Sequence, residues 1–200
     1  MCVGGKDPVR YTRLMAERVI PHGLLTVEEY LEMEATASVR HEYVGGMVYA
    51  MVGTTKRHNR IAGNVYARLL AAARGGPCRV YVEAVKLRVE DVIYYPDVMV
   101  ACGAEDDDPL IENAPCLVVE VASPSTESID RREKMLAYRS IPTLRAYLIV
   151  AQDDRRVERY WRGEDGEWRQ GEAVGEGSEV PIPCPSPIEI TLSEIYEGLE

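Results

Sequence analysis

The chain has 200 residues and a formal net charge of −10, with 33 acidic against 23 basic side chains. This balance excludes a nonspecific polycationic nucleic-acid binder, because such affinity comes largely from Lys and Arg on phosphates. With 46% hydrophobic and 28% charged residues, the chain is too apolar to be disordered, and its length is typical of one domain.

Residues 1–23 show no sustained hydrophobic period and end in Pro21 and Gly23. They are predicted to form a tail or strap ahead of a single domain at residues 24–200. The segment also lacks the apolar stretch of a signal peptide, and no apolar run approaches the roughly 20 residues of a membrane-spanning helix. We therefore expect a cytoplasmic protein without a membrane partner.

Cysteines are spread along the chain, odd in number and without a C-x-x-C pair. Free cysteine is often buried, so this pattern favours inert thiols over zinc or redox chemistry. The five residues are Cys2, Cys78, Cys102, Cys116 and Cys184.

Capping and turn residues predict the first elements of the domain. Thr26 and Glu29 have the spacing of a capping box, which predicts a short helix after Thr26. Residues 41–52 are mostly apolar and are interrupted by Gly45 and Gly46. This pattern indicates two antiparallel strands joined by a turn.

The middle of the chain combines a long helix with strands. Residues 58–73 carry apolar side chains at steps of three and four, the period of an amphipathic helix. Residues 79–89 alternate, as expected for a strand with one buried face. Residues 94–102 and 116–122 are almost continuously apolar, which is typical of central strands covered on both faces. The acidic segment 103–115 is expected to be an exposed loop.

The last third adds a second helix and further strands. Residues 129–140 are predicted to form a helix that directs Met135, Leu136 and Tyr138 toward the core. The remaining expected elements are a strand at 144–150, a hairpin at 156–161 and 167–170, an extended loop at 171–187 and a short helix opened by Ser193. This order predicts an α/β fold built on a mixed sheet.

Two carboxylates lie in strands that are otherwise apolar. Asp97 precedes one run, and Glu120 lies near the end of the other. Ionised carboxylates are rarely buried unless they are paired or bind a metal. If the two strands are neighbours, both carboxylates lie at one end of the sheet and suit a hard ion such as Mg²⁺, which can activate a water nucleophile. A solvated strand end or a salt bridge is the alternative for each.

Several phrases of the sequence resemble one known family. Pro96-Asp97 on one strand and Glu120 on the next are similar to the PD-(D/E)XK nuclease superfamily. A longer set of phrases resembles, in the same order, the Uma-type family of bacterial restriction endonucleases. These phrases are RHEYVGGMVYAM, HN at positions 58–59, YYPDVMVACG, LVVEVASPST and the helix from Asp130 to Lys134.

The resemblance covers residues 26–196 and implies a restriction-endonuclease-like core of mixed sheet and flanking helices, with added β-hairpins. It implies that Asp97 and Glu120 bind Mg²⁺, or alternatively Mn²⁺, and that the backbone carbonyl of Val121 supplies a further oxygen. Similar nucleases place a lysine two residues after the acid, to orient water and stabilise charge on the phosphate. That position is Ala122 here, so the simple motif is broken.

Two lysines are candidates to replace the missing one. Lys134 lies on the following helix, where similar families have moved their lysine, and its alternative role is an i,i+4 salt bridge with Asp130. Lys86 lies on the strand before Asp97, and its alternative role is that of an exposed strand residue. We favour Lys134.

The first hairpin and the long helix add two further candidates. Glu42 matches the acidic residue of the family's first hairpin and would complete the metal site, with an exposed strand residue as the alternative. His58 begins the long helix and is a candidate for contact with phosphate or substrate, with an ordinary polar N-terminal residue as the alternative. The family's hairpin often has an acid where this chain has Met47, so the hairpin's contribution stays open.

The sequence supports two functions of different classes. The first is a Mg²⁺-dependent endonuclease that hydrolyses DNA phosphodiester bonds, with a symmetric homodimer suited to cutting both strands. The second is a catalytically inactive nuclease-like binding or regulatory module, favoured by Ala122 and the acidic balance. A third possibility is a hydrolase that uses the two carboxylates as acid and base on a sugar. It needs only a suitable separation of the carboxyl groups, and nothing else in the sequence indicates it. Arginines on two helices would give a locally positive cleft for DNA: Arg57, Arg60, Arg68, Arg74, Arg131, Arg132 and Arg139.

Overall fold

The computed structural model describes residues 18–19, 23–51, 53–105, 107–123 and 126–199. The expected tail at residues 1–23 lies almost entirely outside these ranges. Its described part includes strand β1 (Arg18–Val19), which pairs antiparallel with β3 (Met47–Ala50). No helix in the described ranges is long and apolar enough to cross a membrane.

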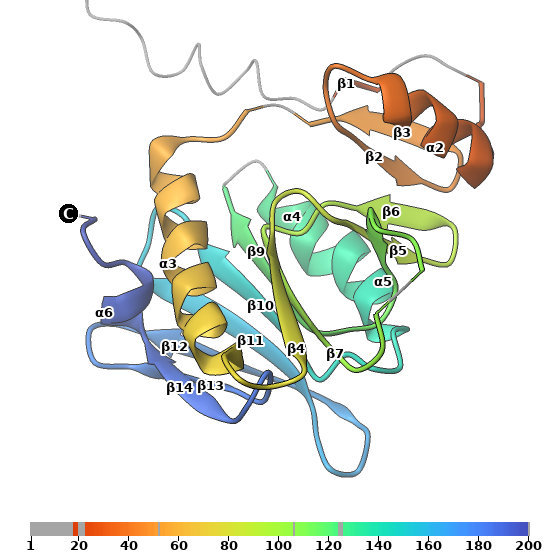
Figure 1. Ribbon diagram of the computed structural model, residues 1–200. Helices are drawn as coiled ribbons and strands as arrows, with labels where there is room; N and C mark the ends of the chain where they lie inside the picture. Colours follow the sequence, from red (N-terminus) through yellow and green to blue (C-terminus); the bar gives the residue numbers. More distant parts are fainter. Residues whose placement is uncertain (1–17, 20–22, 52, 106, 124–125, 200) are drawn as a thin grey trace, which may run out of the picture.

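A six-stranded mixed sheet forms the centre of the molecule (Figure 1). Its order is β12-β11-β10-β9-β7-β4, and β9 and β10 are parallel while the other neighbours are antiparallel. The strands are β4 (Cys78–Val82), β7 (Val98–Cys102), β9 (Pro115–Ala122), β10 (Ala146–Ala151), β11 (Arg156–Arg162) and β12 (Trp168–Val174). The structure confirms the predicted mixed α/β fold.

A second sheet has the order β1-β3-β2-β6-β5-β8. Its other strands are β2 (His41–Val44), β5 (Lys86–Val89), β6 (Val92–Tyr94) and β8 (Ile111–Glu112). Helix α2 (Val27–Thr36) covers this sheet through Tyr30, which packs with Tyr43, Val48 and Ile93. Thr26 and Glu29 form the expected capping box, which satisfies free N–H groups at the start of this helix.

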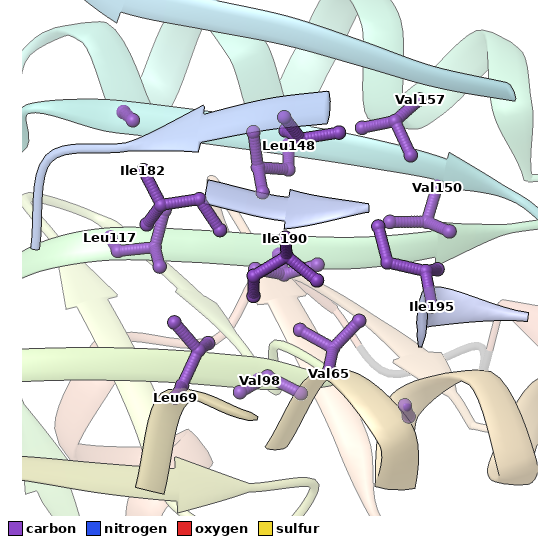
Figure 2. Packing of buried hydrophobic residues seen from close by; sticks show 14 of the residues in the cluster. Val65, Leu69, Val98, Leu117, Leu148, Val150, Val157, Ile182, Ile190 and Ile195 are labelled. Carbon is purple, nitrogen blue, oxygen red and sulfur yellow. The ribbon is translucent and has the colours of Figure 1, made fainter. Parts of the chain in front are cut away.

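One face of the central sheet is covered by α3 (Lys56–Ala73) and by C-terminal elements. Figure 2 shows Val65 and Leu69 of the helix directed toward Val98 and Leu117 of the sheet. Burying each such side chain contributes about 1.5–3 kcal/mol. The C-terminal elements are the antiparallel pair β13 (Glu179–Ile182) and β14 (Ile188–Thr191), followed by α6 (Leu192–Ile195).

The opposite face is covered by one helical segment after β9 (Figure 1). It consists of α4 (Glu127–Ile129), a π-helical turn η1 (Asp130–Lys134) and α5 (Met135–Arg139). Tyr138 packs edge-on against Tyr147 of β10, and Met135 lies in the same cluster. The expectation that Leu136 also points to the core is wrong, because its side chain is 73% exposed.

Two strands predicted as continuous are each divided between the two sheets. The run 79–89 splits into β4 and β5, and the run 94–102 splits into β6 and β7. The first break lies where the apolar alternation steps by three, from Val82 to Val85, and the second lies in an almost continuously apolar segment, where periodicity gives no sign of it. Glu83, with φ of +55°, turns the chain after β4, and Pro96 lacks the N–H that a continuing strand needs. The second crossing places Asp97 directly before β7.

Three smaller expectations also differ from the structure. The loop predicted at 171–187 contains the end of β12 and all of β13, because alternating Val180 and Ile182 are buried against the core. The acidic loop at 103–115 includes the short strand β8. The last helix is capped by Thr191 with Glu194, two residues before Ser193.

Candidate active site

Strand register brings Asp97 and Glu120 to one end of the central sheet. Val98 of β7 pairs with Val119 of β9 in antiparallel register, so Asp97 and Glu120 are the next opposite positions. Because alternate residues share a face, Glu120 faces the helical segment together with Val118. The two strands are neighbours, as the sequence argument required.

The ammonium of Lys134 lies among three carboxylates. Its Nζ atom is 3.1 Å from Oε1 of Glu120, 3.3 Å from Oε1 of Glu42 and 3.4 Å from Oδ1 of Asp130. The Tyr138 hydroxyl donates a 2.8 Å hydrogen bond to the same Oε1 atom of Glu120. Lys134 and Glu120 are only 8% and 4% exposed. These five residues are called the acidic site below.

The carboxylates of the acidic site outnumber the cation that they bind. Burial lowers the pKa of Lys134, but the charges of Glu120, Glu42 and Asp130 outweigh this and hold the pKa well above its ordinary value. Burial raises the pKa of Glu120; Lys134 opposes the shift, whereas Asp97 and Asp130 add to it. Burial also raises the pKa of Asp130. A further positive charge at the acidic site would therefore be stabilised by these carboxylates.

Asp97 is held by the backbone and by a histidine. Its Oδ2 atom accepts a 2.6 Å hydrogen bond from the N–H of Val121 and lies 3.2 Å from Nε2 of His58. Burial lowers the pKa of His58, but Asp97, together with Glu83 and the backbone of Val121, outweighs burial, so the net shift is upward. The buried Nδ1 atom of His58 has no hydrogen-bond partner among the described residues. Asp97 and Val121, expected in one metal site, thus lie together, and His58, expected to contact phosphate or substrate, lies beside them.

The second sheet supplies Glu42 to the acidic site from β2. Its Oε1 atom also accepts a 3.4 Å hydrogen bond from the N–H of Tyr95. Met47, at the position where the family often has an acid, begins β3 beside the turn and is 43% exposed. This hairpin therefore reaches the site through its first strand.

Lys86 has other neighbours than Lys134. Its Nζ atom lies 5.5 Å from the centre of the Tyr95 ring, and it forms no ion pair with any residue of the described ranges. The side chain is buried, so the alternative of an exposed strand lysine is also incorrect. Of the two candidate lysines, the structure brings Lys134 to Glu120.

Residues 27–193 match the model of the Uma2 family, described as "Putative restriction endonuclease". The chain belongs to the Uma2 family. Two uncharacterized proteins of Synechocystis sp. (strain ATCC 27184 / PCC 6803 / Kazusa) are similar to it. One, slr1290, is 36% identical over 151 residues, which cover 74% of this chain and 80% of the relative. The other, sll1609, is 32% identical over 163 residues, which cover 78% and 92%.

A solved structure shares the fold of this Uma2 chain. It is the crystal structure of a putative nuclease belonging to DUF820 from Anabaena variabilis ATCC 29413. The TM-score is 0.71 at 15% sequence identity, and the match covers 86% of this chain and 97% of the other. The predicted restriction-endonuclease-like architecture is therefore confirmed.

Two members of the acidic site were not assigned to it from the sequence. The sequence predicts Asp130 only as a salt-bridge partner of Lys134, and Tyr138 only as a core residue. A signal was present, because positions 130, 134 and 138 are spaced by four and lie on one side of a helix. Together with a carboxylate at Glu120, that spacing predicts that the carboxylate of Asp130, the ammonium of Lys134 and the hydroxyl of Tyr138 point to one place.

The expected positive cleft is weakened by internal pairing. Arg68 of α3 lies 3.4 Å from carboxylate oxygens of Glu194 and Glu197. Arg131 binds Glu127 and Glu158. The guanidinium groups on these two helices are thus partly used within the Uma2 fold itself.

The expectation of separate inert thiols is wrong. Cys78 is joined to Cys102, and Cys116 to Cys184, as disulfides. Cys2 lies outside the described residues. We searched the described residues for groups of three or more His, Cys, Asp or Glu side chains whose possible ligand atoms all lie within 4.8 Å of one another. The group found consists of Cys102, Cys116 and Cys184. The carboxylates of the acidic site are instead spaced around Lys134.

Proposed function

We propose that this Uma2 protein is a Mg²⁺-dependent endonuclease that hydrolyses DNA phosphodiester bonds at the acidic site and Asp97. The observation that carries the proposal is the buried Lys134 ammonium bound by Glu120, with Asp97 on the neighbouring strand. This combination of two strand acids and one lysine, on a nuclease-like fold, suits phosphoryl transfer by positioning and charge stabilisation.

The residues present fit a divalent ion. Glu42, Asp97, Glu120 and Asp130 offer carboxylate oxygens, the ligands that Mg²⁺ and Mn²⁺ prefer. Three carboxylates share the single Lys134 ammonium, so negative charge is in excess around it. Asp97 and Glu120, with the carbonyl of Val121, would hold the ion. When bound, it would activate a water molecule and polarise the phosphate.

The remaining groups have roles that follow from their contacts. Lys134 would stabilise negative charge developing on the phosphate, because its ammonium is buried and fixed by carboxylates. Tyr138 orients Glu120 by its hydroxyl hydrogen bond. The N–H of Val121 fixes the Asp97 carboxylate. His58, whose Nε2 atom lies 3.2 Å from Oδ2 of Asp97, would hold that carboxylate beside the phosphate.

A catalytically inactive nuclease-like module is the second candidate. Two observations favour it. Ala122 stands where the usual lysine would be, and Arg68 and Arg131, two of the arginines expected to bind DNA, pair with carboxylates of this chain. An inactive module would bind a partner without cleaving DNA, with or without dimerisation.

Calorimetric titration with Mg²⁺ and Mn²⁺, followed by plasmid cleavage with the same preparations, tests the proposal. The variants are Asp97→Asn and Glu120→Gln. Glu112→Gln is the matched control, because Glu112 is also a buried strand glutamate but pairs with Arg79 away from the site. Loss of metal binding and cleavage in the first two variants alone would support an endonuclease. Cleavage absent from the unmodified chain with either ion would favour the inactive module.

A further inference from the structure

A second cluster of potential metal ligands lies away from the acidic site. Four cysteines converge from three strands and one loop: Cys78 of β4, Cys102 of β7, Cys116 of β9 and Cys184 between β13 and β14. They are called the cysteine cluster below. Cys78 and Cys102 are opposite one another in the β4–β7 register. These cysteines are separated by 14 (116 − 102) to 106 (184 − 78) residues in the sequence, so their convergence is not visible there.

The cysteine cluster is separate from the acidic site. Cys116 lies four residues before Glu120 on β9, a distance of about 13 Å along an extended strand. Asp97 precedes β7, whereas Cys102 ends it. Cys116 and Cys184 belong to the core on the α3 face, because the register shift beside Cys116 breaks the alternation of β9 there, and Glu120 points to the opposite face. The cluster therefore needs its own explanation.

The sulfur atoms of different pairs are in contact. Sγ of Cys102 lies 3.5 Å from Sγ of Cys116 and 3.6 Å from Sγ of Cys184. In a tetrahedral zinc site with Zn–S bonds of about 2.3 Å, ligand sulfurs are separated by about 3.8 Å. Two independent disulfides have no reason to lie against each other, whereas four ligands of one ion must. The mutual spacing of the Cys102, Cys116 and Cys184 sulfurs suits a single ion and is too small for an iron–sulfur cluster, and Cys78, opposite Cys102 on β4, is the fourth sulfur within reach.

We propose that, when its thiols are reduced, the cysteine cluster binds one Zn²⁺ ion as a tetrathiolate. Four sulfur ligands without an open position are typical of a structural zinc site. Cys116 and Cys184 are buried, while Cys78 and Cys102 are partly exposed, so an ion can reach the sulfurs from one side.

The disulfide form converts to the zinc-bound form by reduction followed by metal binding, and both steps balance in atoms and electrons. A phosphine reductant and one water molecule reduce each disulfide to two thiols, and the phosphine is oxidised to its oxide. Zinc then replaces the four thiol protons, which are released to solvent, and the resulting centre carries a charge of −2. Zinc binding is consequently favoured by higher pH and by reducing conditions.

The ion would fasten the C-terminal hairpin to the central sheet. Cys184 follows Ile182, and both lie in the core that β13 and β14 complete over β9 and β10. Figure 2 shows Ile182 and Ile190 over the strands that carry Leu117 and Leu148. A zinc ion bound by Cys184 and by the cysteines of β4, β7 and β9 would hold this hairpin against the central sheet. Its role would therefore be structural.

Cobalt substitution tests the proposal without a variant and without a cleavage assay. The full chain is reduced with a phosphine, freed of metal and titrated with Co²⁺ under anaerobic conditions. We expect thiolate-to-cobalt charge-transfer absorption and the visible bands of a tetrahedral ion, saturating at one equivalent and lost on adding one equivalent of Zn²⁺. Absence of these bands in the reduced, folded chain would overturn the proposal.

Variants identify the ligands. Cys116→Ser and Cys184→Ser should abolish the cobalt charge-transfer bands, and zinc content should fall from one ion per chain to near zero. Cys2→Ser is the control and should retain both. Unchanged zinc content in Cys184→Ser would also overturn the assignment, as would a chain whose two disulfides resist the phosphine under native conditions. Because neither readout involves DNA, these outcomes are independent of the endonuclease proposal.

Discussion

Lys134 places its ammonium 3.1 Å from Oε1 of Glu120 although the two residues belong to different elements. In similar nucleases the lysine follows the acid by two residues on the same strand, where this chain has Ala122. Residues 120 and 122 share a face of β9, and the small Ala122 packs in the same cluster as Met135. The helix thus lies close enough to deliver its own lysine to the acid.

Replacing Lys134 with methionine should both destabilise the metal-free protein and abolish cleavage. The substitution leaves Glu42, Glu120 and Asp130 buried without their cation, a change that typically costs about 3–5 kcal/mol. Cleavage should fall by about 100-fold or more, because the charge facing the phosphate is lost. Denaturant unfolding in chelator and plasmid cleavage measure the two effects.

Lys86→Met is the matched control for that substitution. Lys86 is also a buried lysine, but it lies over the Tyr95 ring and not against Glu120. Its loss should leave cleavage within a few-fold of the unmodified chain. Cleavage that survives in Lys134→Met and disappears in Lys86→Met would transfer the role to Lys86.

Tyr138→Phe should affect the site more than Tyr147→Phe, although both hydroxyls are buried. Tyr138 donates to the Glu120 carboxylate, whereas Tyr147 donates a 3.1 Å hydrogen bond to the backbone carbonyl of Asp130. Hydrogen bonds to charged groups contribute about 1.5–3 kcal/mol and neutral ones about 0.5–1.5 kcal/mol. Urea unfolding should rank the variants in that order, with cleavage reduced chiefly in Tyr138→Phe. Equal losses would argue against a special role for the Tyr138 hydroxyl.

Much of the fold follows from local sequence signals. The capping box at Thr26, the turn at Gly45-Gly46 and the period of α3 each depend on residues close in the chain, and each element is present. The division of residues 79–89 and 94–102 between two sheets was not predictable in this way. Which sheet a strand joins depends on distant partners, such as Ile111 beside Lys86.

The candidate site, like the fold, was predictable from the sequence only in part. Asp97 and Glu120 stand out because a carboxylate in an apolar strand requires a partner. Asp130 and Tyr138 do not stand out, since a helix normally carries both types. The convergence of the cysteines was also hidden, because β4, β7, β9 and the loop at Cys184 meet only in the folded chain.

Acid should weaken the contact between the helical segment and β11 through Glu158. Burial raises the pKa of Glu158, but hydrogen bonds from Arg131 and the charges of Arg131 and Arg156 outweigh it, so the net shift is downward. A lowered pKa in the folded state means that this contribution is complete above the unfolded value of about 4.3 and is lost as pH falls through the folded value.

The free energy of unfolding of the unmodified chain and of Glu158→Gln should be compared from pH 7 down to pH 3 by urea titration. The difference between them should stay constant above about pH 5 and shrink below the ordinary pKa range of glutamate. Glu164→Gln is the control, because Glu164 is exposed and makes no ion pair with a described residue. A difference that does not change with pH would show that Glu158 acts through packing and not through its charge.

The two glycines of the first hairpin should tolerate alanine unequally. Both have positive φ, +53° at Gly45 and +94° at Gly46, so alanine is strained at either position. At Gly45 an added Cβ meets nothing within 4 Å, whereas at Gly46 it would lie 2.9 Å from Cδ2 and 3.1 Å from Cβ of Leu24. The backbone N–H of Leu25 also donates a 2.9 Å hydrogen bond to the carbonyl of Gly46, which holds the two segments together.

Gly45→Ala should therefore lower the free energy of unfolding, measured by urea denaturation, by about 1–2 kcal/mol. Gly46→Ala should lower it by more. Because this hairpin carries Glu42 to Lys134, Gly46→Ala should also reduce cleavage, and an equal tolerance of both substitutions would show that the chain before α2 yields easily.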